Sequence, residues 1–205
     1  QEKIAPNIIQ VFKNPKQSIK YKYVCEIRSC PDDIYCHPKT ISLKITSKPD
    51  MFQNVIKVAI PHLRTEIPLF VLFRALGCNG DKDIIYHIID NDNSKIDKDI
   101  FKILRPSIRD ADSVNSQAEA LKYMVKYINN TNYSNYQNAD EEIKIKYIRN
   151  VILKDVFPHL GECCIKKSYF LGLMANKLIK CYMGLSDTDD RDSYINKRIE
   201  SGDHL

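Results

Sequence analysis

From residue 67 to residue 77 the chain reads Ile-Pro-Leu-Phe-Val-Leu-Phe-Arg-Ala-Leu-Gly, its longest nearly uninterrupted apolar run. Pro68 suits the first turn of a helix, where its missing N–H would have no partner, and Gly77 suits the left-handed residue that ends one. Between them we expect a helix of roughly nine residues that is apolar on nearly every side and therefore buried. The exception is Arg74, which we expect to reach a carboxylate or solvent rather than to bind a ligand.

The residues before this run predict β-structure. Apolar side chains alternate with polar ones along two segments, at Tyr21, Tyr23, Cys25 and Ile27 and again at Ile41, Leu43 and Ile45. The same period resumes over 56–60 after an expected turn at 47–50. With 7–13 as the first member, we predict three or four antiparallel strands in meander order, with one face buried and the other wet.

After the run the pattern changes to the helical period. We expect Asp81 to cap one helix, Pro106 to stop the next, and the capping-box pair Ser116 and Glu119 to open another. A polar loop over 129–138 should follow. The last long helix should bury one stripe of side chains: Phe170, Leu173, Met174, Leu178 and Cys181.

These patterns together predict an α+β fold, an N-terminal antiparallel sheet followed by a layer of about six helices. We expect one domain over 1–205, with a β-rich part at 1–62, a helical part at 63–184 and an exit segment at 185–205.

Composition restricts the class of protein. A chain of 205 residues with 43% apolar residues can bury a sizeable core. No apolar run approaches the roughly 20 residues of a membrane span, so we expect a soluble protein. Seven irregularly spaced cysteines indicate reduced, intracellular thiols, and a net charge of +5 allows a nucleic-acid surface without requiring one.

Three stretches of this chain resemble one known family. They are the opening residues 1–7, the run 66–77 with its flanking Glu66, and the segment Asp189-Asp190-Arg191-Asp192-Ser193-Tyr194-Ile195-Asn196-Lys197-Arg198. The last resembles the signature Asp-Asp-x-Asp-His-x-Gly-Asn-Lys-Arg, with Ser193 in place of His and Ile195 in place of Gly. The resemblance is to the lobe of the second-largest subunit of multisubunit DNA-dependent RNA polymerases, of the RNA polymerase II-like kind, from a eukaryote or a large DNA virus.

The resemblance implies a structural, non-catalytic lobe that forms one wall of the DNA cleft and offers a docking surface to other subunits and transcription factors. The parent enzyme would be a DNA-directed RNA polymerase, a nucleotidyltransferase whose catalytic Mg²⁺ is held by the largest subunit, with no cofactor in this fragment. Partners would be the largest subunit, other subunits, transcription factors and DNA, with no membrane. The location would be intracellular: the nucleus in a eukaryote, the virion or a cytoplasmic factory for a virus.

In this family the lobe is inserted into a neighbouring domain. The resemblance therefore implies that this chain is a piece of a longer one and that Gln1 and Leu205 lie near one another.

Two side-chain groups could in principle hold metals, and we disfavour both. Carboxylates suited to a hard cation such as Mg²⁺ occur at Asp187, Asp189, Asp190 and Asp192. Residue types suited to zinc occur at Cys25, Cys30, Cys36 and His37, although not at the spacing of a paired knuckle. The five histidines are scattered and no phosphate-binding glycine loop is present, so nothing indicates independent catalysis.

The candidate nucleic-acid contacts are Arg191, Lys197 and Arg198 in the exit segment, where basic side chains could neutralise phosphates. The lysines on the outer face of the early strands are a second set, for which we favour a solvated or partner-facing role. The alternative to a polymerase lobe is a free-standing helical adaptor or nucleic-acid-binding module, and a third class is an Mg²⁺-dependent nuclease that uses the aspartate cluster.

Overall fold

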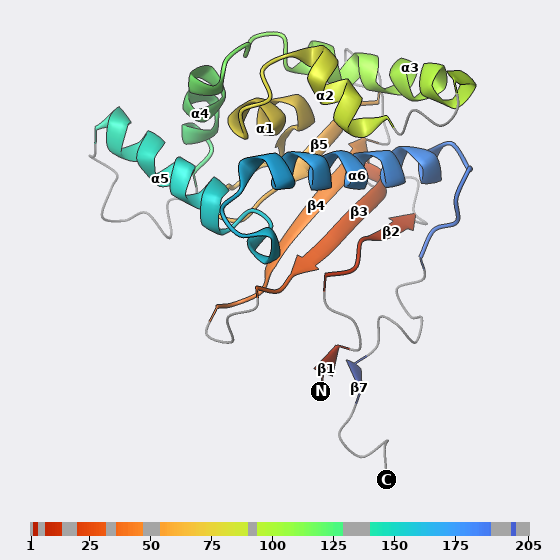
Figure 1. The fold of residues 1–205 in the computed structure, drawn as a ribbon, viewed down its shortest axis with the longest axis horizontal. Helices are drawn as coiled ribbons and strands as arrows, with labels where there is room; N and C mark the ends of the chain where they lie inside the picture. The colour runs from red at the N-terminus through yellow and green to blue at the C-terminus, as the bar shows by residue number, and fades with distance from the viewer. Residues whose placement is uncertain are drawn as a thin grey trace.

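A computed structural model describes residues 2–3, 7–13, 20–31, 36–46, 54–89, 94–128, 140–189 and 198–199. The chain first forms an antiparallel sheet and then a helical layer, as predicted (Figure 1). The expected turn at 47–50 and the polar loop at 129–138 lie outside the described residues.

The main sheet is a meander in which each strand pairs with the next along the chain. Its strands are β2 (Gln10–Lys13), β3 (Tyr21–Ser29), β4 (Lys39–Thr46), β5 (Ile56–Ala59) and β6 (Ile67–Pro68). The described sheet thus has five strands rather than three or four, because the start of the apolar run pairs with β5 before it becomes helical. β6 lies beyond residue 62, the expected end of the β-rich part.

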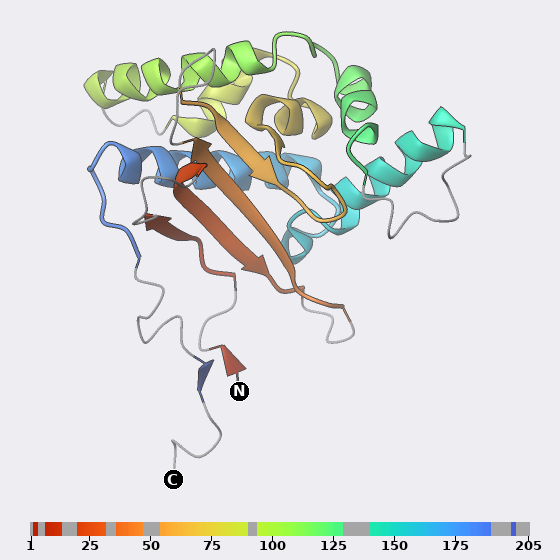
Figure 2. The same ribbon diagram turned by 180° about the vertical axis from the view of Figure 1, so that it is seen from behind.

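The two faces of this sheet are covered differently. The long helix α6 (Cys164–Tyr182) lies across one face, where the rings of Tyr23 and Tyr182 meet edge to face at 5.7 Å (Figure 1). Figure 2 shows the sheet from the opposite side. On that side we expected only wet positions, but Val24 is buried because it lies directly opposite Phe12 of β2, which is also buried.

Helix α1 (Leu69–Ala75) is the centre of the core, and all of its residues are buried as predicted. It is shorter than expected, because Pro68 is the extended residue that precedes the helix and not part of its first turn. Gly77 has a φ of 104°, the left-handed conformation that was predicted for the residue after the helix.

Two of the helix boundaries predicted from the sequence are wrong. Helix α2 (Asp81–Ile88) is preceded by Gly80 as its cap residue, and Asp81 instead binds Arg74. Helix α3 (Ser94–Asp110) continues through Pro106. A proline inside a helix costs about 3 kcal/mol. Burial of the following turn offsets this cost, since Ser107 is buried and its Oγ accepts a hydrogen bond of 2.9 Å from the backbone N–H of Ile56 in β5.

Helix α4 begins where the sequence predicts. Ser116 and Glu119 form the reciprocal capping box of α4 (Gln117–Val125). The acidic residues at 140–142 lie at the start of α5 (Glu141–Lys154), and a short 3₁₀ turn, η3 (Pro158–Leu160), leads into α6. Within α6 the predicted stripe is wrong at Leu173, whose surface is 50% exposed.

Within the described ranges, no helix combines the length and the apolar character that crossing a lipid bilayer requires.

Candidate nucleic-acid and partner surfaces

The exit segment returns to the point where the chain enters the domain. Strand β1 (Glu2–Lys3) pairs antiparallel with β7 (Arg198–Ile199), with Glu2 opposite Ile199 (Figure 1). This pairing is consistent with the expected closeness of the chain ends, although Gln1 and Leu205 themselves lie outside the described residues. Of the predicted DNA contacts, Arg198 lies in β7, and Arg191 and Lys197 fall outside the described part of the chain.

The first residue of the exit signature has a structural contact that sequence reasoning missed. The backbone N–H of Val11 donates to Asp189 Oδ2, and the N–H of Asp189 donates to the Val11 carbonyl, both at 2.7 Å. Lys177 Nζ on α6 lies 3.6 Å from the same carboxylate oxygen and donates to the carbonyl of Ile9 at 2.7 Å. Asp189 therefore fixes the outgoing chain to the edge strand β2.

The aspartates of the exit segment are not brought together in the described part of the chain. Asp187 and Asp189 are exposed, and Asp190 and Asp192 lie outside the described residues. Cys181 Sγ donates to the Asp187 carbonyl at 3.3 Å, which holds the backbone there. Across the described ranges, no three His, Cys, Asp or Glu side chains are grouped so that they could hold a metal ion.

The Cys and His candidates for zinc occupy different environments. Cys25 is buried in β3, where desolvation raises the pKa of its thiol far above the ordinary value. Cys30 Sγ lies 3.7 Å from the carbonyl of Arg28, whereas Cys36 and His37 are exposed. Cys36 and His37 line a groove of about 450 Å³ beside Asp155, and the Asp155 carboxylate is already paired with Lys39 at 3.0 Å.

The side chain of His87 is half-buried on α2 and packs against neighbouring side chains. Its Nε2 lies 3.5 Å from Cys78 Sγ, and its ring lies against the ring of Tyr169, with centroids 4.3 Å apart.

The lysines of the early strands are largely engaged within the domain. Lys44 Nζ and Lys20 Nζ lie 3.1 and 3.7 Å from the Glu66 carboxylate, and Lys22 Nζ lies 5.6 Å from the centroid of the Tyr182 ring. Burial alone would raise the pKa of Glu66, but backbone hydrogen bonding and the hydrogen bond from Lys44 outweigh it and lower this pKa to about 2. These contacts favour a structural role for the strand lysines.

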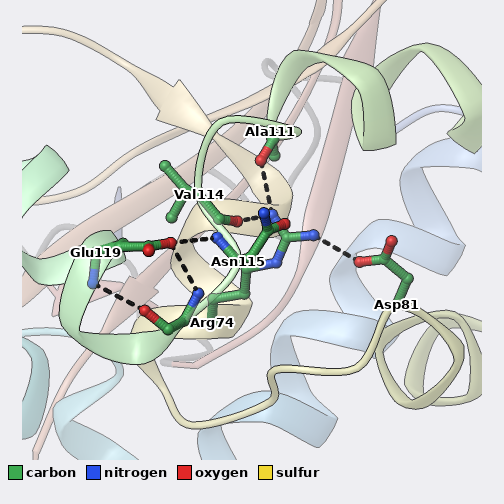
Figure 3. Close-up of polar contacts among 7 residues, drawn as sticks. Arg74, Asp81, Ala111, Val114, Asn115 and Glu119 are labelled. Carbon is green, nitrogen blue, oxygen red and sulfur yellow. Dashed lines mark hydrogen bonds and ion pairs between the residues drawn. The ribbon is translucent and has the colours of Figure 1, made fainter.

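Arg74 is a buried structural cation, as predicted (Figure 3). Its Nη2 lies 2.6 Å from Asp81 Oδ1, and its Nη1 donates to the carbonyls of Ala111, at 2.7 Å, and Val114. The next helix is fixed at the same place, because the N–H groups of Asn115 and Ser116 donate to Glu119 and hold the pKa of Glu119 below its ordinary value. Arg74 thus joins α1 to the start of α2 and to the α3–α4 turn.

Sequence reasoning also missed Lys167, a fully buried lysine on α6. Its Nζ donates to the carbonyls of Ile152, at 3.0 Å, and Leu153, at 2.5 Å, which are among the last carbonyls of α5. Burial lowers the pKa of the Lys167 ammonium to about 8. The flanking sequence carries no signal for this contact, because lysine is rarely found fully buried.

A third omission is a surface on α3. Phe101 is 37% exposed and lies among basic side chains on the outer side of the helix. The signal was present in the sequence as the helical spacing of Lys98, Lys102, Arg105 and Arg109.

The comparisons with known proteins agree with the family resemblance of the sequence. A family model described as RNA polymerase Rpb2, domain 2, matches residues 5–200. The chain is 35% identical over 207 residues to the DNA-directed RNA polymerase II subunit 2 of Arabidopsis thaliana, which covers 98% of this chain and 17% of that protein. It is 36% identical over 203 residues to the subunit RPB2 of Encephalitozoon cuniculi, with 98% of this chain and 16% of that protein covered.

A viral relative is similar over the same extent. DNA-directed RNA polymerase subunit 2 of Acanthamoeba polyphaga mimivirus is 29% identical over 219 residues, covering 97% of this chain and 17% of that protein. The chain thus spans only 16% to 17% of the length of these three relatives. Because the family model covers nearly the whole chain and two relatives exceed 30% identity, this chain belongs to the family of RNA polymerase Rpb2, domain 2, the lobe of the second-largest subunit.

Proposed function

We propose that this chain is a non-catalytic structural lobe that forms one wall of the DNA cleft of a DNA-directed RNA polymerase and presents its outer surface to other subunits and transcription factors. The parent enzyme would add nucleotides with Mg²⁺ held on its largest subunit. Among the described residues of this chain, no set of side chains is grouped so that it could bind such an ion. The location would be intracellular, in a nucleus or a viral factory.

The pairing of β1 with β7 is the observation that supports this proposal best. It brings the incoming and outgoing segments together as a two-stranded connection below the sheet and helices (Figure 1). Such a connection would let a compact unit project from a longer chain, as a lobe beside DNA does. The fixing of Asp189 to β2 gives the exit segment, which carries Arg191, Lys197 and Arg198, a defined starting point on the domain.

Contact with DNA is tested by fluorescence anisotropy of a labelled DNA duplex titrated with this chain at a series of salt concentrations. In the test variant Lys197 and Arg198 are both changed to Ala. In the matched control, two exposed lysines away from the exit segment are changed to Ala. They are Lys122 in α4 and Lys126 directly after it. Both variants lose the same charge, so only the position of the charge differs.

We expect wild-type binding to weaken steeply with salt and the slope of log K against log salt to fall by up to about 2 in the test variant. The control should keep the wild-type slope. Equal slopes in the two variants would show that Lys197 and Arg198 of the exit segment do not contact DNA. An absence of binding at low salt would leave the chain as a scaffold for protein partners.

A further inference from the structure

The outer side of α3 carries an aromatic ring that the core does not use. The buried stripe of this helix runs through Ile100 and Leu104, whereas Phe101 points away from that stripe and is 37% exposed. Figure 1 shows α3 at the rim of the helical layer, remote from β1 and β7. Because single exposed apolar side chains are common on protein surfaces, the meaning of Phe101 depends on the residues around it.

Phe101 is part of a groove and not of a flat surface. A cavity of about 450 Å³ lies between α3 and the residue that follows α2, and it is lined by Ile89, Asp97, Lys98, Phe101, Lys102 and Arg105. Ile89 and Phe101 supply apolar surface, so the groove can bury one aliphatic or aromatic side chain of a ligand.

The rim of this groove is cationic. Among the residues that the structure describes, three basic side chains line the groove together with one carboxylate, that of Asp97. The guanidinium of Arg105 lies 5.5 Å from the centroid of the Phe101 ring, which holds that cation at the apolar surface. Lys102 pairs with Asp99 at 2.7 Å, but both side chains are exposed, and an exposed pair of this kind contributes little to stability. These cations are therefore free to exchange water or a weak partner for a carboxylate on a ligand.

We propose that this groove binds an acidic segment of a partner protein, which inserts an apolar side chain between Ile89 and Phe101 and places carboxylates against Lys98, Lys102 and Arg105. Charge complementarity selects an acidic ligand, and the apolar lining favours a polypeptide over nucleic acid. A phosphate backbone brings no apolar group, and Arg105 already lies over the Phe101 ring on which a base would stack. The inference rests on the proposed function, in which the outer surface receives other polypeptides, and names the chemistry of one of them.

The test uses a fluorescein-labelled peptide in which two leucines, one helical turn apart, are flanked by glutamates. A matched peptide has every glutamate replaced by glutamine, and a labelled DNA duplex is the third ligand. Anisotropy is measured with the wild-type chain and with Phe101→Ala and Arg105→Glu. The controls are Leu173→Ala, which removes an exposed apolar side chain elsewhere, and Lys166→Glu, which reverses an exposed charge on α6.

We expect the acidic peptide to bind the wild-type chain and to lose about tenfold in affinity with Phe101→Ala and at least as much with Arg105→Glu. The two controls should bind as the wild type does, and the glutamine peptide should bind at least tenfold more weakly. Equal binding of the two peptides, or equal losses in the groove variants and the controls, would overturn the proposal.

Binding of the DNA duplex distinguishes the proposed contact of the exit segment with DNA from the proposed peptide site on α3. If the groove variants bind DNA normally while Lys197→Ala with Arg198→Ala does not, the cleft-wall role survives whatever the peptide result. If Phe101→Ala and Arg105→Glu weaken DNA binding instead of peptide binding, the groove is a nucleic-acid contact and the peptide proposal is wrong.

Discussion

Gly172 on α6 lies directly against the backbone of His87 on α2. A Cβ atom built at Gly172 would lie 2.1 Å from the His87 carbonyl oxygen, far inside van der Waals contact. One turn further along α6, Asn176 Nδ2 donates to the Ile88 carbonyl at 2.7 Å. The absence of a side chain at 172 thus lets α6 approach the end of α2 closely enough for Asn176 to satisfy one of its last carbonyls.

Gly172→Ala should therefore destabilise the domain, although the same change in an exposed helix interior usually stabilises it. The two helices must separate, and we expect a loss of about 1–3 kcal/mol in the free energy of unfolding. This loss is measured by urea unfolding, monitored by circular dichroism. A stability equal to or above that of the wild type would show that the contact relaxes without cost.

Arg74→Ala should act on stability and not directly on binding. It leaves the carbonyls of Ala111 and Val114 without their buried donor, and removing one partner of a buried ionic contact typically costs about 3–5 kcal/mol. Asp81→Asn is the matched test of the other partner and should cost much less, because the Asp81 side chain is 44% exposed. A normally stable Arg74→Ala chain that had lost partner binding would contradict this assignment.

Leu72→Ala and Leu173→Ala make the same chemical change at a buried and an exposed leucine. Leu72 lies at the centre of α1 with 0% of its surface exposed, and its truncation should cost about 2–5 kcal/mol in the free energy of unfolding. Leu173 should change stability by less than about 0.5 kcal/mol. A cost below about 1 kcal/mol for Leu72→Ala would be inconsistent with a central position of α1.

The burial of Lys167 should make the free energy of unfolding depend on pH above about pH 8. Its pKa falls from the ordinary 10.5 to about 8 on folding, because burial disfavours the ammonium. Below pH 8 both states hold the proton and the penalty of burying the charge is present in full. As the pH rises from about 8 to 10.5, the folded state loses its proton first and this penalty is relieved.

Lys167→Met isolates this effect from the other titrating groups. The free energy of unfolding of the wild type, minus that of Lys167→Met at each pH, should increase between about pH 8 and pH 10.5. Urea unfolding at a series of pH values provides both curves. A difference that stays constant over this range would mean that the buried lysine titrates normally.

The architecture could be predicted from the sequence because its signals are local. Alternation along β3 and β4 marked the strands, and the reciprocal spacing of Ser116 and Glu119 marked the start of α4. The candidate site was harder to predict from the sequence than the architecture. The basic residues Arg191 and Lys197 lie outside the described part of the chain, so their contact with DNA stays a prediction. The groove on α3 was missed because it forms only where α3 packs beside Ile89, the residue that follows α2.

The sequence by itself determined the order of the elements, the burial of the run that became α1 and the resemblance of the exit segment to its family. These follow from residues that are neighbours along the chain. Only the tertiary structure decided that α3 continues through Pro106, that Arg74 binds Asp81 and two carbonyls, and that Lys167 is buried. In each case the stabilisation from contacts between distant segments exceeds the cost of going against the local preference of the residue. Those contacts exist only once the sheet and helices have packed.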